Sequence, residues 1–181
     1  MNYQPKAGEK ARIDEAEFTR KLENPVKASY QQDMKEHWDV QGTLEGQLSK
    51  FEVKGLKRFN RNDAQPQDNM ACVEYIGITG YPGWVQGKSD YIAFKRIKYP
   101  WLVVNRQQLW EMVEAKLKER NYSPSIKPWY EKEAYATYDR SYFGKKDKFC
   151  WVPYEDIEQI KDIKKLEKWF LLFVTRIITI N

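Results

Sequence analysis

A short triplet, Glu52-Val53-Lys54, has the residue types and spacing of a site that could hydrolyse a phosphodiester. On a strand, residues two positions apart project from the same face, so the Glu52 carboxylate and the Lys54 ammonium group would reach the same small volume. The reaction needs one or two hard cations, held by carboxylates, to polarise the phosphoryl oxygen and supply hydroxide. A lysine beside the cation could orient or help deprotonate the attacking water and offset the charge of the transition state.

A second carboxylate is expected from the strand that precedes this triplet. The segments 37–41 and 50–56 alternate as strands do, and Glu45-Gly46-Gln47 between them has the composition of a turn, which predicts a β-hairpin. A symmetric register would set Asp39 about opposite Lys54 or Glu52, where opposed side chains approach most closely. The apolar neighbours of Glu52 would then occupy the other face of the strand.

Other side chains could complete such a site. Glu74 lies in a predicted strand over 71–78, where an unpaired carboxylate would be costly to bury, so it is a further candidate. Additional acids or a base could come from Glu15, Glu17, Asp33 and His37. A structural role stays open for each: exposed helix surface for the acids, a hydrogen-bonded histidine for His37, and a surface ion pair for Glu52 and Lys54.

The elements that would position these residues follow from periodicity and turn residues. Helices are predicted over 12–23, after a capping-box pattern at Ser29 and Gln32, over 106–119 with one apolar face, and after Pro153. Further strands are predicted over 91–95, 101–104 and 149–152, and an irregular stretch over 122–142. This order predicts an α/β or α+β domain with a mixed sheet.

Composition sets the remaining limits. The 181 residues are 41% hydrophobic and carry a net charge of +5, which predicts one domain with a mild electrostatic footprint for nucleic acid. The two cysteines, far apart in the sequence, predict buried thiols in a reducing, cytoplasmic setting. The first ten residues are polar, and the apolar stretch 169–180 is too short to span a bilayer, so no membrane partner is expected.

The arrangement of Asp39, Glu52 and Lys54 resembles the PD-(D/E)xK superfamily of restriction-endonuclease-like nucleases. The resemblance covers roughly residues 14–119, and it departs from the family in having Trp38 where a proline often precedes the first aspartate. It implies that Asp39 and Glu52 are metal ligands and that Lys54 is the catalytic lysine. It also implies a restriction-endonuclease-like core with a mixed central β-sheet flanked by helices.

These expectations combine into a first hypothesis, a nuclease dependent on Mg²⁺ or Mn²⁺ that cuts DNA. In this hypothesis Glu74 assists the catalytic residues. The nuclease-like domain spans 1–181, with a flexible stretch 1–10 and a C-terminal elaboration over 121–181. The protein could also form a homodimer. Basic residues after the triplet would contact the nucleic-acid backbone, namely Lys57, Arg58 and Arg61, followed by Lys95, Arg96 and Lys98. The alternative is a non-catalytic nucleic-acid-binding or protein-interaction module on the same fold.

Overall fold

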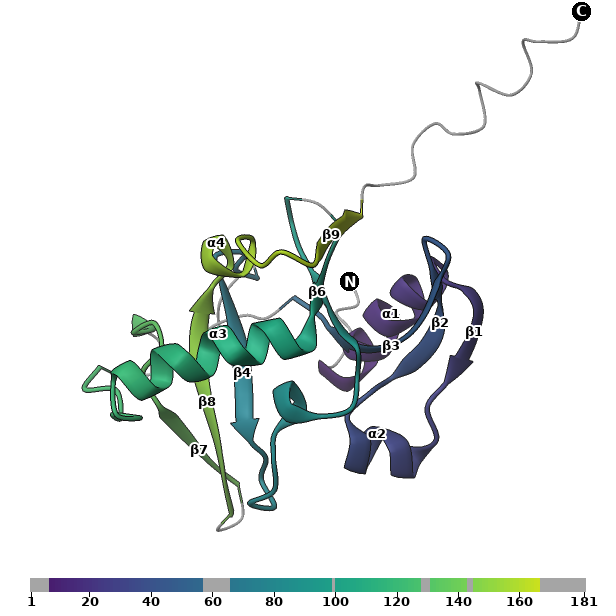
Figure 1. Ribbon diagram of the computed structural model, residues 1–181. Coiled ribbons are helices and arrows are strands. Elements are labelled where there is room, and N and C mark those ends of the chain that lie inside the picture. The colour runs from purple at the N-terminus through teal and green to yellow at the C-terminus, as the bar shows by residue number, and fades with distance from the viewer. Residues whose placement is uncertain (1–6, 57–65, 99, 128–130, 143–144, 167–181) are drawn as a thin grey trace, which may run out of the picture.

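The computed structural model describes residues 7–56, 66–98, 100–127, 131–142 and 145–166 and has two β-sheets with several helices (Figure 1). The larger sheet has the strand order β1-β2-β3-β5-β6-β9. Its strands are β1 (Glu23–Lys27), β2 (Val40–Leu44), β3 (Gln47–Lys54), β5 (Tyr91–Lys95), β6 (Trp101–Asn105) and β9 (Ile163–Leu166). The smaller sheet, in the order β4-β8-β7, consists of β4 (Met70–Ile76), β8 (Lys145–Pro153) and β7 (Tyr138–Tyr142).

The larger sheet is mixed, as the sequence predicts. Strand β3 pairs with β5 in parallel, with Lys54 beside Phe94, whereas its other neighbour, β2, is antiparallel. The parallel connection needs a long crossover. The chain makes this crossover through β4 and the 3₁₀ turn η1 (Trp84–Gln86). The carboxyl end of β3 therefore lies next to elements that come much later in the sequence.

The predicted hairpin forms, but its first strand is shorter than expected. Helix α2 (Tyr30–Glu36) has the capping box of Ser29 and Gln32 and ends at His37, whose φ of 53° is left-handed. Strand β2 therefore starts at Val40, and the prediction that His37 and Asp39 lie on this strand is wrong. The turn to β3 has positive φ at both Glu45 (52°) and Gly46 (81°), as the tightest hairpin turns require.

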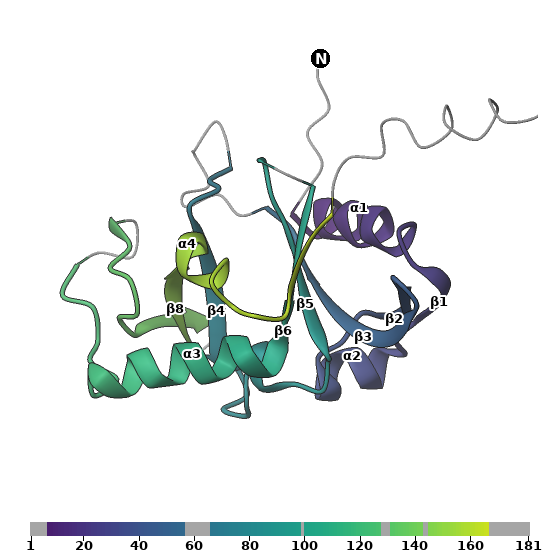
Figure 2. The ribbon, with the colours of Figure 1, turned by 45° about the horizontal axis from the view of Figure 1, so that its top comes forward.

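The two faces of the larger sheet are covered by different layers. Helix α1 (Ala7–Thr19) packs Phe18 against Phe51 of β3 and Trp101 of β6, with ring centroids 5.2 and 5.0 Å apart. Figure 2 shows helix α3 (Arg106–Glu119) and the smaller sheet away from α1. One buried cluster there contains residues of both sheets, such as Leu102 and Val152. This cluster joins the two sheets around one core.

Three strands and one short helix differ from the sequence-based expectations. No strand was predicted at β1, the segment of β7 was predicted to be irregular, and that of β9 was predicted to be helical. The helix after Pro153, α4, covers only Tyr154–Ile157. The apolar stripe after Pro153 fits a helix locally, but residues 163–166 pair with β6, which satisfies their backbone hydrogen bonds. In the described parts of the chain, no helix is long and apolar enough to cross a membrane.

Candidate functional site

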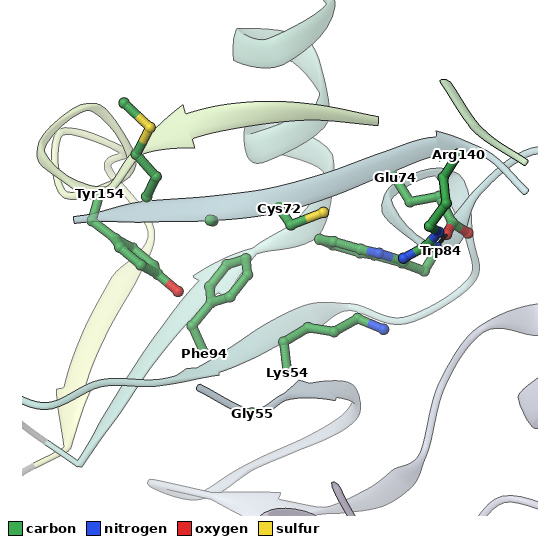
Figure 3. Close-up of a pocket in the computed structure, with 10 residues that line it drawn as sticks. Lys54, Gly55, Cys72, Glu74, Trp84, Phe94, Arg140 and Tyr154 are labelled. Atoms are coloured by element: carbon green, nitrogen blue, oxygen red, sulfur yellow. Dashed lines mark hydrogen bonds and ion pairs between the residues drawn. The ribbon is translucent and has the colours of Figure 1, made fainter. Parts of the chain in front are cut away.

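The end of β3 has apolar side chains on one face and charged side chains on the other. Phe51 and Val53 pack on the α1 side, while Glu52 and Lys54 project from the opposite face. The Glu52 side chain is 5% exposed and forms an ion pair with the ammonium group of Lys54. Figure 3 shows Lys54 extending toward Trp84, and its Nζ lies 4.7 Å from the centroid of that ring. The predicted same-face arrangement of Glu52 and Lys54 is present.

Asp39 lies directly before β2, beside β3. The last pair of the β2–β3 ladder is Val40 with Phe51, and the Asp39 amide also donates to the Phe51 carbonyl, at 2.8 Å, so Asp39 lies outside the regular register that would set it opposite Glu52. Its carboxylate Oδ2 accepts the Val53 amide at 2.6 Å and so takes the place of a backbone acceptor at the end of the ladder. Burial and the nearby charge of Glu52 raise the pKa of Asp39 to about 7.

Lys54 is the cation at the centre of several carboxylates. Burial alone would favour its neutral amine, but the charge and hydrogen bond of Glu52, with the charges of Asp39 and Glu74, raise the pKa of Lys54 above its usual value. Asp33 of α2 belongs to the same electrostatic neighbourhood, because burial and the charge of Glu52 raise its pKa. A lysine in this setting stays charged at neutral pH, which suits charge stabilisation better than proton abstraction.

Asp39 and Glu52 offer carboxylate oxygens, the type of ligand that a hard divalent cation takes. Glu52 has one oxygen, Oε2, that is buried and has no hydrogen-bond partner in the described structure. Such a carboxylate oxygen is costly unless something compensates it. The described residues contain no group of three or more His, Cys, Asp or Glu arranged around one point. Mg²⁺ commonly uses one or two carboxylates and keeps several waters, so two acids suffice for it.

Glu74 approaches Lys54 from the smaller sheet. Its carboxylate Oε2 lies 3.4 Å from a guanidinium nitrogen of Arg140, which also pairs with the buried Asp147. Burial and the neighbouring carboxylate of Asp147 raise the pKa of Glu74. Glu74 therefore belongs to the same charged region as the triplet, and it is bound to a partner of its own.

Two glycines position Trp84 beneath Lys54. A Cβ on Gly83 would lie 2.4 Å from the Glu74 carbonyl oxygen, and one on Gly87 would lie 2.6 Å from the His37 Cβ. The η1 turn is thereby held between β4 and the end of α2. Trp84 was not connected to the site in the sequence analysis. The signal was available in the two glycines that flank the tryptophan.

The acids of α1 have structural partners. Asp14, 3% exposed, fills the space that a Cβ on Gly55 would need and forms an ion pair of 2.8 Å with Lys95. Glu17 binds the same lysine at 2.6 Å, and Glu15 binds Lys27 at 2.7 Å. The glycine after the triplet is thus explained by the close approach of α1.

Only some of the residues expected to contact nucleic acid lie in the described part of the chain. Lys57, Arg58 and Arg61 lie outside the described residues. Arg96, 6% exposed, pairs with Asp68 at 2.6 Å, so its guanidinium is used inside the fold, as is the ammonium group of Lys95. Neither cysteine is in a disulfide: Cys72 is half-buried, so the prediction of buried thiols holds for Cys150 alone, where burial raises the pKa of the thiol.

Comparison with known proteins identified no relative of this chain. No family model, no curated protein and no solved structure matches the chain. The case for a function therefore rests on the geometry and chemistry of the residues described above.

Proposed function

We propose that this protein is a metal-dependent nuclease of the PD-(D/E)xK type that hydrolyses phosphodiester bonds in DNA. Asp39 and Glu52 would hold Mg²⁺ or Mn²⁺, which supplies Lewis acidity and a nucleophilic water. Lys54 would offset negative charge on the reacting phosphoryl group. Glu74, which approaches Lys54 from the smaller sheet, would assist by keeping Lys54 protonated.

The observation that carries the proposal is the local excess of negative charge around one lysine. Asp39, Glu52 and Glu74 all act electrostatically on Lys54, and Asp33 acts on the same group of charges. Arg140 already pairs with Glu74, so the two acids left around Lys54 are Asp39 and Glu52, which repel each other, and Glu52 also buries an oxygen without a hydrogen-bond partner in the described residues. A divalent cation would relieve both costs at once.

Cleavage of supercoiled plasmid with increasing Mg²⁺ or Mn²⁺ tests the proposal. Glu52→Gln and Lys54→Met keep the size of each side chain and remove its charge. We expect each variant to cut at least ~100-fold more slowly, because each loses an electrostatic contact made to the reacting centre. Circular dichroism and thermal unfolding check that both variants stay folded.

Lys50→Met is the matched control. Lys50 lies on β3, four residues before Lys54, and its Nζ lies 4.9 Å from the Trp38 ring centroid, as Lys54 lies over Trp84. Its carboxylate partner is Glu36, at 4.0 Å. We expect cleavage by Lys50→Met to stay within about threefold of wild type. Wild-type rates in both Glu52→Gln and Lys54→Met would refute the proposal.

A non-catalytic binding module is the second candidate function. The observation in its favour is that the Asp39 carboxylate accepts the Val53 amide and that Glu52 pairs with Lys54. A structural network would make both contacts. In that case the protein would bind DNA with no metal-dependent cutting by any variant. Isothermal titration with Mg²⁺ separates the two functions, since the binding module has no reason to show Glu52-dependent heat.

A further inference from the structure

A pocket of about 120 Å³ opens beside Lys54, between the two sheets (Figure 3). Lys54 comes to it from β3 and Phe94 from β5 of the larger sheet, and Glu74 comes from β4 of the smaller sheet. The pocket shares Lys54 with the candidate metal site. A group bound in it would therefore lie beside a phosphodiester held by that site.

Aromatic rings form one wall of this pocket. Phe94 contacts both Trp84 and Tyr154 edge to face, with centroids 6.2 and 5.6 Å apart. All three rings are less than a tenth exposed. The Tyr154 ring is also held by the Arg96 guanidinium, whose Cζ lies 3.6 Å from the ring centroid. A fixed aromatic wall of this kind suits a flat heterocycle, since bases gain affinity by contact with aromatic side chains.

The other end of the pocket is polar. Arg140 offers guanidinium donors, and Glu74, 3.4 Å away, offers carboxylate acceptors. The Arg140 side chain is 60% exposed, so this end is the one that solvent reaches. A donor beside an acceptor matches the edge of a pyrimidine base, which presents a carbonyl oxygen or ring nitrogen next to an N–H group.

The volume of the pocket limits the size of the ligand that it can hold. A cavity of about 150 Å³ in a protein core accepts benzene, and the pocket of about 120 Å³ is of comparable size and open on one side. One six-membered ring fits such a space, whereas a base pair is far too large. The base would have to be unpaired, as in enzymes that extrude a nucleotide from the duplex.

We propose that the pocket formed by Trp84, Phe94, Tyr154, Glu74 and Arg140 binds one unpaired pyrimidine base of the nucleic-acid substrate. This inference rests on the proposed function and adds to it a preference for DNA with a locally unpaired nucleotide. Arg140 donates to the carbonyl oxygen or ring nitrogen at the edge of the base, and Glu74 accepts the N–H group beside it. The aromatic wall contacts the ring.

The test compares three labelled duplexes of the same sequence: fully paired, with one extra thymidine, and with an abasic residue in place of that thymidine. Affinity is measured by fluorescence anisotropy with full-length wild-type protein in Ca²⁺, and a gel verifies that the DNA is intact. We expect the thymidine duplex to bind ~10-fold more tightly than the abasic one. This comparison needs no variant, so it does not depend on how a substitution folds.

Arg140→Gln and Lys146→Gln form a matched pair of charge removals. Lys146 is exposed and belongs to the same β7–β8 hairpin, but it does not line the pocket. We expect Arg140→Gln to lose the preference for thymidine over the abasic residue and Lys146→Gln to keep it. Equal binding of the two duplexes by wild type, or a full preference in Arg140→Gln, overturns the proposal.

The two proposals fail by different measurements. The nuclease function is judged by cleavage in the Glu52 and Lys54 variants. The pocket is judged by the ratio of two affinities, which is measured without cleavage.

Discussion

Asp39 shows how a single carboxyl can have both a structural and a chemical role. One oxygen of its carboxylate completes the backbone hydrogen bonding of Val53, and the group lies close enough to Glu52 to be affected by its charge. Without a cation, the two acids repel each other in a partly buried place. Burial, and after it this repulsion from Glu52, raises the pKa of Asp39 to about 7.

The folded protein should therefore lose stability as Asp39 ionises. Its carboxyl has a pKa of about 7 in the folded protein and 3.8 in the unfolded chain, so the folded state binds more protons between these two pH values. Stability falls as pH rises through this window and levels off above about pH 7. Asp39→Asn removes the ionisation and keeps an oxygen to accept the Val53 amide. In EDTA, we expect Asp39→Asn to gain ~1–2 kcal/mol relative to wild type between pH 4 and pH 8.

Urea unfolding across this pH range measures that difference. The full pKa shift would give a larger figure, but solvent reaches part of Asp39 and weakens the effect. Saturating Mg²⁺ should reverse the order at pH 8, because a cation that binds the folded wild type stabilises it. A difference between the proteins that is independent of pH would contradict the assigned pKa.

At the scale of elements, the site depends on a short turn rather than on a long helix. The η1 turn lies against the Glu74 carbonyl at one end and His37 at the other, and Trp84 between them supports Lys54. Each contact is possible because a glycine has no Cβ. The turn therefore links β4, α2 and β3 at one point.

Substituting these glycines should disturb Lys54 without touching it. Gly87→Ala would bring a methyl group against the His37 Cβ and the Glu36 carbonyl oxygen, at 2.6 and 2.7 Å, so the turn must shift. We expect a loss of ~1–3 kcal/mol in the free energy of unfolding, and a parallel loss of metal-dependent cleavage. Gly8→Ala is the control, since nothing lies within 4 Å of the added Cβ. If the two substitutions have equal effects on stability, the close approach at Gly87 is not what holds the turn.

At the scale of the whole molecule, the two sheets share one buried cluster. Leu102 of the larger sheet and Val152 of the smaller sheet are both fully buried in it, together with residues of α3. The pocket lies at the same junction. Its geometry therefore depends on both sheets being folded.

We expect the described core to unfold in a single transition. Leu102→Ala and Val152→Ala should each lower the free energy of unfolding by ~2–4 kcal/mol, because each leaves a cavity. Both variants should keep the coincidence of the far-ultraviolet circular dichroism and tryptophan fluorescence curves that two-state unfolding requires. Leu48→Ala, at a position 62% exposed, should change stability by less than about 0.5 kcal/mol. Separate transitions for the two probes would indicate that the sheets unfold independently.

The sequence by itself determined the features that depend on neighbours along the chain. Strand alternation set Glu52 and Lys54 on one face, the turn residues predicted the hairpin, and one apolar face predicted the helix that covers Arg106–Glu119. These follow from covalent spacing and local hydrogen bonding, which a short window of sequence contains. The predicted position of Asp39 opposite Lys54 or Glu52 is not part of the paired ladder, because β2 begins at Val40 and the Asp39 amide binds the Phe51 carbonyl.

Only the tertiary structure decided which groups surround that triplet. Trp84 reaches Lys54 through a crossover between parallel strands, and Arg140 reaches Glu74 across 66 positions of sequence. Residues 163–166 became a strand because β6 offered them hydrogen bonds that no local pattern records. Contacts of this kind depend on how sheets pack and on where a missing Cβ allows close approach. The triplet was visible in the sequence, whereas the charge around it, the aromatic wall and the pocket arose from the fold.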